Sequence, residues 1–375
     1  MNLLNIYSQD IPQFVEEIIN TTEFKRLKNV GMNCGCEYTS FPIFAKGKDY
    51  TRYDHSIGVA LIIWHFTKDI KQSIAGLLHD ISSPAFAHVI DFLNGDHENQ
   101  ESTEEKTEEI IENSAEIQKI LKKYNLTTKD VYDYHMYPIA DNDSPLLSAD
   151  RLEYTIGNAF CYGFKSLEEL KEIYDDLTVS KNELGEDEIS FNSLDKAVNF
   201  THAALLNSKV YASDIDRFSM QYLADLLKLA VDKKVININD LYSIESEVII
   251  KLEKDSQLKA MWDEFRSFSQ VLTNKTKPDK GYWVNIPAKR RYINPYVISQ
   301  GRVATLSSKC AKDIEEFLEF CKIVIKNKPI TVNSKLVSIR LLMKYICKYH
   351  KGIFKYNISL QVPKIKMEPA LCNGR

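Results

Sequence analysis

The chain has 375 residues, with 48 lysines and arginines against 52 aspartates and glutamates, and 44% of its residues are hydrophobic. A composition of this kind folds around an apolar core, which excludes disordered and fibrous proteins. The formal net charge of −4 argues against a protein that coats nucleic acid, because counterion-driven binding needs a basic surface. A small basic pocket is compatible with that charge, so nucleic acid is possible as a partner but is not indicated.

Membrane and disulfide signals are weak throughout the chain. The longest apolar run, residues 59–66 (VALIIWHF), is too short to cross a bilayer and is broken by His65. The first ten residues lack the basic start and apolar stretch of a signal peptide. Seven cysteines, an odd number, show no disulfide-like spacing, and Cys34-Gly-Cys36 has no second pair to complete a zinc site. We therefore expect reduced thiols in a cytoplasmic protein that does not contact a membrane.

Helical periodicity dominates the first half of the chain. Apolar residues at three- and four-residue steps predict one helix from residue 55 and a second, largely buried helix around 74–81. Eight glutamates lie between Glu98 and Glu116, and several share one helical stripe. This stripe predicts a helix face exposed to solvent.

Further along, the sequence Asp143-Ser144-Pro145 is typical of a helix start, because a capping side chain precedes a proline in the first turn. Another helical stretch is predicted over 200–231. The fold class expected is mainly α with minor β. Strand patterns are found at 40–44, within a short hairpin near 40–50, and in the C-terminal part at 291–298 and 356–362.

The adjacent residues His79 and Asp80 are the main indication of a metal site in the sequence. Five of the eight histidines fall within 43 residues, and His79-Asp80 closes a buried apolar helix. A buried carboxylate costs several kcal/mol unless it is paired or bound to a metal. Imidazole nitrogen with carboxylate oxygen suits a divalent ion of the Mn, Fe, Mg or Zn range. Two ligands cannot hold a catalytic ion, so His55 and Asp150 are the residues expected to complete a His2Asp2 set.

The order of these residues resembles the HD-domain metal-dependent phosphohydrolases. The motifs around them narrow the resemblance to the deoxynucleoside triphosphate triphosphohydrolase-like branch and cover residues 20 to 310. KVY at 209–211, followed by Arg217, and RRYINPYV with LSS within 290–308 are similar to its later segments. Its earlier motifs are matched by EFKRLKNVGM (23–32), TRYDHSIGVA (51–60), AGLLHDISSPAFAH (75–88), DHENQES (96–102) and ADRLEY (149–154).

The resemblance implies a helical HD core over 1–235, with a mostly helical C-terminal region over 236–375 that has minor β and packs on the core. It also implies a homo-oligomer and a metal-dependent hydrolase that acts on a nucleotide through a metal-activated water. The best-matching reaction splits a nucleoside triphosphate into nucleoside and triphosphate. The metal ligands implied are His55, His79, Asp80 and Asp150.

Several further residues are candidates for binding substrate. Arg52 and Arg151 lie beside metal ligands, and guanidinium groups bind phosphate oxygens bidentately. Tyr154, one helical turn beyond Asp150, can donate its hydroxyl to phosphate or sugar. The resemblance adds three more substrate-binding candidates: Asn158, Tyr211 and Arg217.

His97 is the best candidate for proton transfer to the leaving group, with Glu98 beside it to orient the ring. His88 matches the histidine that closes the HD helix motif, where the resemblance implies contact with phosphate or a role in catalysis. Either histidine could instead be structural. The basic cluster at 289–291 (KRR) is more typical of a strand end exposed to solvent.

Departures from the family pattern leave alternatives open. Ser83 replaces a histidine of the proton network, and Met32 and Asn158 stand where nucleoside-contacting residues are common. The alternatives are a phosphodiesterase or nucleotidase acting on another nucleotide, and a catalytically weakened sensor that binds a nucleotide. The sequence does not decide the base, the sugar or the metal.

Overall fold

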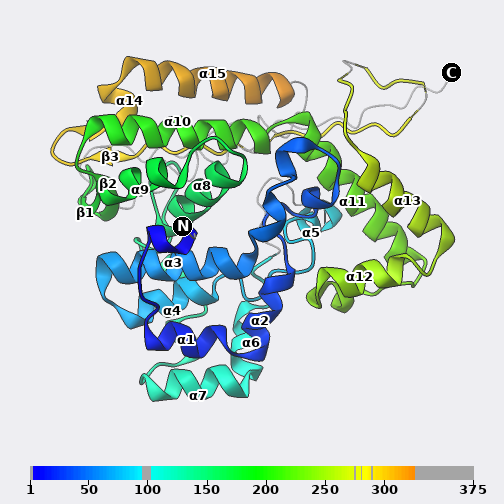
Figure 1. The fold of residues 1–375 in the computed structure, drawn as a ribbon, viewed down its shortest axis with the longest axis horizontal. Coiled ribbons are helices and arrows are strands. Elements are labelled where there is room, and N and C mark those ends of the chain that lie inside the picture. Colours follow the sequence, from blue (N-terminus) through cyan, green and yellow to red (C-terminus); the bar gives the residue numbers. More distant parts are fainter. Residues whose placement is uncertain (1–2, 95–102, 274–275, 280, 289, 326–375) are drawn as a thin grey trace, which may run out of the picture. The chain divides into compact units, whose positions relative to one another are not determined.

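The computed structural model describes residues 3–94, 103–273, 276–279, 281–288 and 290–325. Helices make up most of this part of the chain, and the strands form one small sheet (Figure 1). The mainly α fold with minor β is therefore confirmed. The predicted division at residue 235 stays a prediction, and the strand expected at 356–362 lies outside the described residues.

The first helices build the support of the later site. α3 is buried on nearly all sides and packs against α4 and α8. The helices of this part are α1 (Gln13–Ile19), α2 (Thr22–Lys25), α3 (Arg52–Thr67), α4 (Ile70–Leu78), α5 (Val89–Asn94), α6 (Thr107–Asn113), α7 (Ala115–Lys123), α8 (Ala149–Cys161) and α9 (Leu167–Asp175).

Within the described residues, six helices follow the hairpin, and α10 and α14 contact the sheet. α10 packs against α8 and α15, and α11 packs against α5 and α13. Their bounds are α10 (Leu194–Tyr211), α11 (Asp214–Asp232), α12 (Glu245–Leu252), α13 (Ser256–Ser267), α14 (Val303–Leu306) and α15 (Ser308–Ile325).

The sheet joins segments that are far apart in the sequence. β1 (Leu177–Lys181) and β2 (Asp187–Phe191) form an antiparallel hairpin in which Leu177 pairs with Phe191. β3 (Tyr296–Val297) pairs with β2 in parallel and with β4 (Gly301–Arg302) antiparallel, giving the order β1-β2-β3-β4. The sequence predicted a strand near β3 but not the hairpin.

Local capping explains where the site helices begin and end. Thr51 and Asp54 form a capping box at the start of α3, and Asp69 caps α4 by accepting hydrogen bonds from two backbone amides. Ser148 caps α8 and accepts from the amide of Arg151. The expected start at residues 143–145 is therefore wrong, because α8 begins at Ala149.

Two other local predictions are corrected. The hairpin near 40–50 is wrong: 3-10 helices η4 (Pro42–Phe44) and η5 (Gly47–Asp49) occupy this stretch. Aromatic residues of this apolar run pack into the core instead of alternating, and Phe41 and Phe44 are both buried. The helix expected over 200–231 is broken between α10 and α11 at Ala212–Ser213, where Ser213 caps α11.

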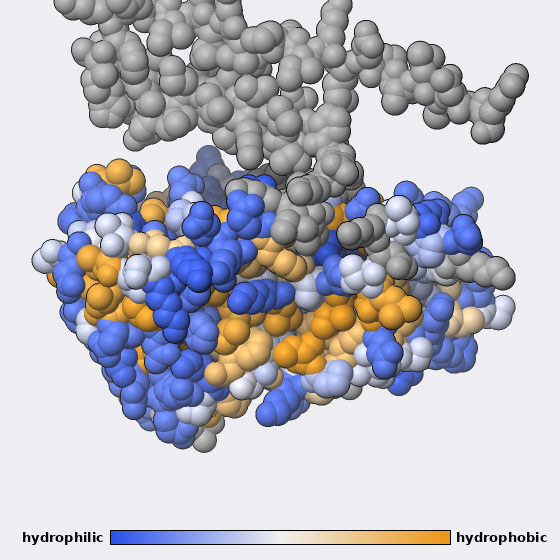
Figure 2. All heavy atoms as spheres, turned by 90° about the horizontal axis from the view of Figure 1, so that it is seen from above, coloured by the Kyte–Doolittle hydropathy of each residue, from blue (hydrophilic) through white to orange (hydrophobic). Residues whose placement is uncertain are grey.

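The apolar interior has three clusters. The largest surrounds α3, α4, α8 and α10, a second lies between α11, α12 and α13, and a third joins α15 to α10. Figure 2, seen from the α15 side, shows patches of apolar side chains between hydrophilic ones on this face. In the described part of the chain, every helix is too short or too polar to span a bilayer.

Candidate active site

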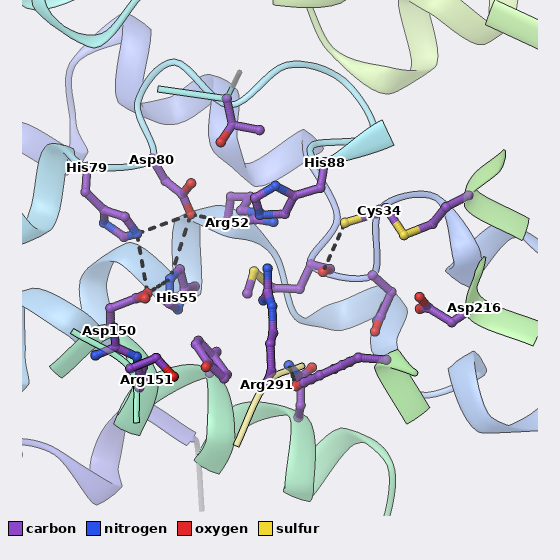
Figure 3. Close-up of a pocket in the computed structure, with 18 of the residues that line it drawn as sticks. Cys34, Arg52, His55, His79, Asp80, His88, Asp150, Arg151, Asp216 and Arg291 are labelled. Atoms are coloured by element: carbon purple, nitrogen blue, oxygen red, sulfur yellow. Dashed lines mark hydrogen bonds and ion pairs between the residues drawn. The ribbon is translucent and has the colours of Figure 1, made fainter. Parts of the chain in front are cut away.

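A cavity of about 410 Å³ lies between α3, α8, α11 and the segment around residues 287–292. Figure 3 shows the predicted metal ligands converging on one side of it, Arg291 crossing its middle and Asp216 on the opposite side. All predicted site residues within the described ranges line this cavity. Those are Arg52, His55, His79, Asp80, His88, Asp150, Arg151, Tyr154, Asn158, Tyr211 and Arg217.

The predicted metal ligands come from three helix ends. His55 lies in the first turn of α3, His79 follows the last residue of α4, and Asp150 lies in the first turn of α8. Ligand atoms of His55, His79 and Asp80 are within 4.8 Å of one another, and all three residues are buried. Nε2 of His55 is 3.1 Å and Nε2 of His79 is 3.7 Å from Oδ1 of Asp150.

The imidazole rings are oriented by hydrogen bonds on their far side. Nδ1 of His55 is 2.5 Å from Oε2 of Glu153, and Nδ1 of His79 is 2.8 Å from the carbonyl of Gly76. Both partners only accept hydrogen bonds, so each Nδ1 carries the proton. Each Nε2 is thereby left facing the shared centre, which is the arrangement typical of metal-ligating histidines.

Charge favours a cation at this centre. Burial opposes ionisation of Asp80, but Arg52 and the two histidines outweigh it and hold the pKa of Asp80 below its usual range. Burial lowers the pKa of His55, yet its hydrogen bonds to Asp150 and Glu153 outweigh this and raise it to about 10. Three carboxyl groups thus surround two imidazoles. This donor set fits a divalent metal of the Mn, Fe, Mg or Zn range.

Arg52 and Arg151 hold the site together from within the protein. Nη1 of Arg52 donates to Oδ2 of Asp80 at 2.8 Å, and both side chains are buried. Arg151 binds the loop that precedes α8, through the carbonyl of Leu146 and the side chain of Asn142. Both guanidinium groups also line the cavity, so the expected contact with phosphate stays a prediction.

His88 is held as a neutral ring. Burial lowers the pKa of His88 to about 4, although its hydrogen bond to Asp91 at 2.9 Å acts in the opposite direction. Because the Asp91 carboxylate accepts the Nδ1 proton, Nε2 presents a lone pair. This geometry suits a proton acceptor better than a phosphate donor. His97 and Glu98 lie outside the described residues.

Two of the residues expected to bind substrate, Tyr154 and Asn158, contact a third, Tyr211. Asn158 donates from Nδ2 to the Tyr211 hydroxyl at 2.8 Å, and its buried Oδ1 has no hydrogen-bond partner. The Tyr154 and Tyr162 rings each lie 6.5 Å from the Tyr211 ring in edge-to-face contacts. Arg217 donates to the carbonyls of Ala212 and Ile286 and pairs with Asp214.

The departures from the family pattern have local structural explanations. Ser83 Oγ donates to Oδ1 of Asp80 at 2.7 Å, so this serine helps to position the carboxylate of a predicted metal ligand. Met32 lines the cavity, as expected for a residue near substrate.

Sequence reasoning missed four residues of the site. Arg291 was expected at a strand end exposed to solvent but lines the cavity, and the only signal was its place in the RRYINPYV segment. Glu104 was expected on an exposed stripe but is partly buried in the cavity wall, unlike Glu105 and Glu108. The sequence carried no signal for the roles of Glu153 and Asp216.

Comparison with known proteins agrees with this geometry. Residues 52–154, which contain all four expected metal ligands, match the family model of the HD domain. The uncharacterized protein YdhJ of Bacillus subtilis is 30% identical over 299 residues, covering 78% of this chain and 86% of YdhJ. The chain belongs to the HD-domain family.

The other similar proteins align with a smaller share of this chain than YdhJ does. The metal-dependent phosphohydrolase cns2 of Cordyceps militaris is 26% identical over 181 residues, 46% of this chain and 48% of cns2. The uncharacterized protein MJ1154 of Methanocaldococcus jannaschii is 24% identical over 252 residues, 64% of this chain and 52% of MJ1154. A crystal structure of a hypothetical protein from Aquifex aeolicus has a TM-score of 0.50 and 21% identity, covering 68% and 71% of the two chains, and supports the fold alone.

Proposed function

We propose that this HD-domain protein is a metal-dependent phosphohydrolase that acts on a nucleotide. The observation that carries the proposal is the convergence of the buried residues His55, His79 and Asp80 with Asp150 in the wall of a cavity that arginines and tyrosines also line. The similarity to the metal-dependent phosphohydrolase cns2 supports the reaction class. The sequence motifs favour a triphosphohydrolase, which releases a nucleoside and triphosphate.

The chemistry follows from the residues present. A divalent cation held by the four ligands would make a water molecule acidic enough to attack phosphorus near neutral pH. Arg52 and Arg151 would orient phosphate oxygens and offset the charge that develops on them. His88, with Nε2 free to accept, would move a proton within the cavity. The cavity volume lies within the ~300–1,000 Å³ typical of small-molecule sites.

The decisive experiment removes one ligand at a time. His79→Ala and Asp80→Ala should each lose the bound metal and reduce hydrolysis at least about 100-fold, because the centre loses a ligand. The measurement is metal analysis followed by chromatography of ribo- and deoxynucleotides incubated with Mn²⁺, Mg²⁺ or Fe²⁺. His65→Ala, which changes an exposed histidine of α3, is the matched control and should retain both properties.

The products separate the possible reactions. Inorganic triphosphate identifies a triphosphohydrolase, whereas a nucleoside monophosphate or free phosphate identifies a phosphodiesterase or nucleotidase. Tight nucleotide binding without turnover in every metal would support a sensor. Full hydrolysis by a metal-free His79→Ala, Asp80→Ala double variant would overturn the proposal.

A further inference from the structure

The end of the cavity at which the predicted metal ligands converge (the metal end) lies across from Asp216 at the opposite end (Figure 3). Phosphate oxygens accept hydrogen bonds, so a ligand whose phosphate lies at the metal end needs donors there. The two arginines beside the predicted ligands use several of their donors on the protein itself. Arg52 donates to Asp80, and Arg151 donates repeatedly to the loop before α8. A donor from another wall of the cavity would therefore strengthen phosphate binding.

Tyr134 forms part of the cavity wall at the metal end, although it lies outside the matched sequence motifs. It belongs to the short 3-10 helix η7 (Tyr134–Met136), lines the cavity and is 6% exposed. Its ring lies against the imidazole of His79, with the ring centroids 4.8 Å apart. Packing therefore holds this side chain beside a predicted metal ligand.

The local fold does not use the hydroxyl of Tyr134. Asp133 caps η7 by accepting from the amide of His135 at 3.0 Å, and the carbonyl of Tyr134 accepts from the amide of Tyr137 at 3.1 Å. Among the described residues, none hydrogen-bonds to the Tyr134 hydroxyl, whereas the Tyr137 hydroxyl donates to the carbonyl of Asp130 at 2.6 Å. The ring and backbone of Tyr134 serve the fold, and its hydroxyl is available to a ligand in the cavity.

The charges around this hydroxyl keep it a donor. Burial, and then the charges of Asp150 and Glu104, raise the pKa of Tyr134 well above its usual range, and Asp141 and Asp80 act in the same direction. These carboxyl groups all line the cavity, so the hydroxyl faces the metal end and keeps its proton. A protonated phenol can donate a hydrogen bond to an anionic oxygen.

We propose that Tyr134 is a substrate-binding residue, whose hydroxyl donates a hydrogen bond to a phosphate oxygen at the metal end. A neutral donor suits this position among the carboxyl groups of Asp80, Asp150 and Glu104. A lysine or arginine here would pair with these carboxylates and compete with a metal cation for them, whereas a phenol does not. The inference rests on the proposed function for the position of the phosphate, and it adds a residue to that site.

Tyr134→Phe tests the hydroxyl by itself, because phenylalanine keeps the ring against His79. The full-length protein is loaded with Mn²⁺, and binding of inorganic phosphate is measured by titration calorimetry. We expect the metal content to stay at the wild-type level and the Kd for phosphate to rise about 10- to 150-fold, the factor expected for a hydrogen bond to a charged group. The kcat/KM for nucleotide hydrolysis should fall by a similar factor.

Two further variants separate the hydroxyl from the ring and from the segment. Tyr137→Phe removes a hydroxyl three residues away that donates to a protein carbonyl. It is the matched control and should leave phosphate affinity and kcat/KM unchanged. Tyr134→Leu removes the ring as well, so His79 loses its packing partner, and metal affinity should fall about 10-fold or more in addition to the loss of phosphate binding.

The outcomes separate this inference from the proposed function. Wild-type phosphate affinity and kinetics in Tyr134→Phe would overturn the role of Tyr134 and leave phosphohydrolase activity in place. A loss of metal in Tyr134→Phe as large as that in His79→Ala would also overturn it, because the hydroxyl would then act through the metal centre. Absence of nucleotide hydrolysis by the wild type, with phosphate binding still weakened in Tyr134→Phe, would overturn the proposed function and support the phosphate contact.

Discussion

Glu153 links the interior of the protein to His55, a predicted metal ligand. It is fully buried and accepts hydrogen bonds from the Tyr50 hydroxyl at 2.5 Å and the Tyr7 hydroxyl at 3.2 Å, besides its contact with His55 Nδ1. A Cβ at Gly58 would lie 2.5 Å from the Glu153 side chain. A glycine at this position of α3 therefore lets Glu153 of α8 approach closely.

Replacing this carboxylate should loosen the metal centre. In Glu153→Gln the amide can accept only through one oxygen, so His55 loses part of the interaction that fixes its Nε2. We expect metal affinity to fall about 10- to 100-fold, measured by competition with a chelator of known affinity. Tyr7→Phe removes only the longer hydrogen bond to Glu153 and should change the affinity far less. Unchanged affinity in Glu153→Gln would show that His55 is oriented by packing alone.

At the scale of elements, two acidic side chains meet where the first residue of α12 lies beside η3 (Cys36–Tyr38). Glu245 begins α12 and accepts from the amide of Gly31 at 2.9 Å and the Tyr38 hydroxyl at 2.8 Å. Glu37 of η3 is buried, and neither of its carboxyl oxygens has a hydrogen-bond partner. Burial, together with the charge of Glu245, raises the pKa of Glu37 to about 8.

This pair should make stability depend on pH. Between the ordinary glutamate pKa of 4.5 and about 8, the folded protein keeps the Glu37 proton while the unfolded chain loses it. The unfolded state binds fewer protons in this range, so the free energy of unfolding falls as pH rises. Glu37→Gln, which is neutral at every pH, should flatten this dependence and stabilise the fold on the order of 1–3 kcal/mol at pH 8.

Urea denaturation at pH 5.5 and pH 8 measures this effect. Glu105→Gln, which changes an exposed glutamate, serves as the control and should follow the wild type at both pH values. A steep fall in stability that persists in Glu37→Gln would assign the pH dependence to other groups.

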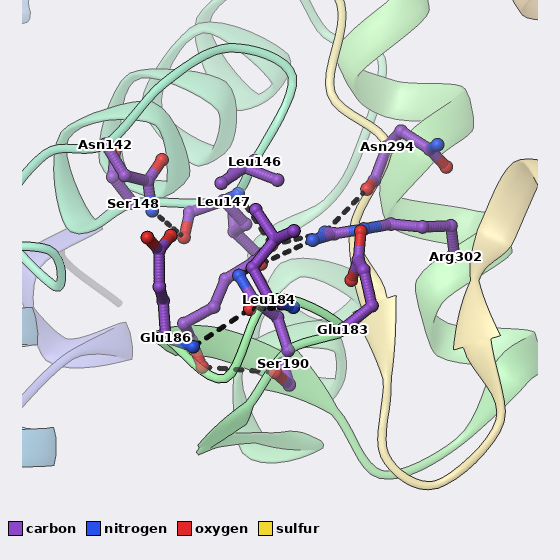
Figure 4. A network of polar contacts seen from close by, with 12 residues as sticks. Asn142, Leu146, Leu147, Ser148, Glu183, Leu184, Glu186, Ser190, Asn294 and Arg302 are labelled. Atoms are coloured by element: carbon purple, nitrogen blue, oxygen red, sulfur yellow. Dashed lines mark hydrogen bonds and ion pairs between the residues drawn. The ribbon is translucent and has the colours of Figure 1, made fainter. Parts of the chain in front are cut away.

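At the scale of the whole molecule, Arg302 of β4 connects the later part of the chain to the β1–β2 hairpin through ion pairs. Its guanidinium binds both carboxylate oxygens of Glu188, at 2.6 and 2.7 Å, and its Nε donates to Glu183 at 2.8 Å. Glu188 also accepts from the amide of Leu147, in the loop that leads to α8. Figure 4 shows this network between the hairpin, the loop before α8 and the segment around Asn294 and Arg302.

Breaking this ion pair should destabilise the fold and the site together. In Arg302→Met the fully buried Glu188 loses its cation, which costs about 3–5 kcal/mol. Activity should fall as well, because the same segment brings Arg291 into the cavity. Thermal unfolding with parallel kinetics measures both effects. Lys181→Met removes an exposed ion pair of the same hairpin and should cost less than about 1 kcal/mol, and an equal cost for both variants would contradict the argument.

The homo-oligomer and the nucleotide partner expected from the sequence stay predictions at this scale. The five cysteines within the described ranges are all free.

The sequence by itself determined the helical class and predicted the four residues that converge as the candidate metal site. His79-Asp80 closes an apolar helix, and motif order links it to His55 and Asp150, so residue type and spacing were enough. Local rules failed where packing decided the conformation. Aromatic residues at 41–44 packed into the core as 3-10 turns, and the hairpin β1–β2 was missed although apolar and polar residues alternate in both of its short strands.

Only the tertiary structure decided which other side chains reach the cavity. Arg291 lies far from the HD motifs in sequence. Asp216 resembles any acidic residue in the first turn of a helix, so the sequence gives no reason to place it in the cavity. Both positions depend on how α11 and the segment around 287–292 pack beside α8. Spacing along one chain reports which residues share a helix face, whereas the convergence of separate elements depends on burying apolar surface between them. For that reason the sequence predicted the metal end of the cavity, and the folded structure was needed to find the opposite end.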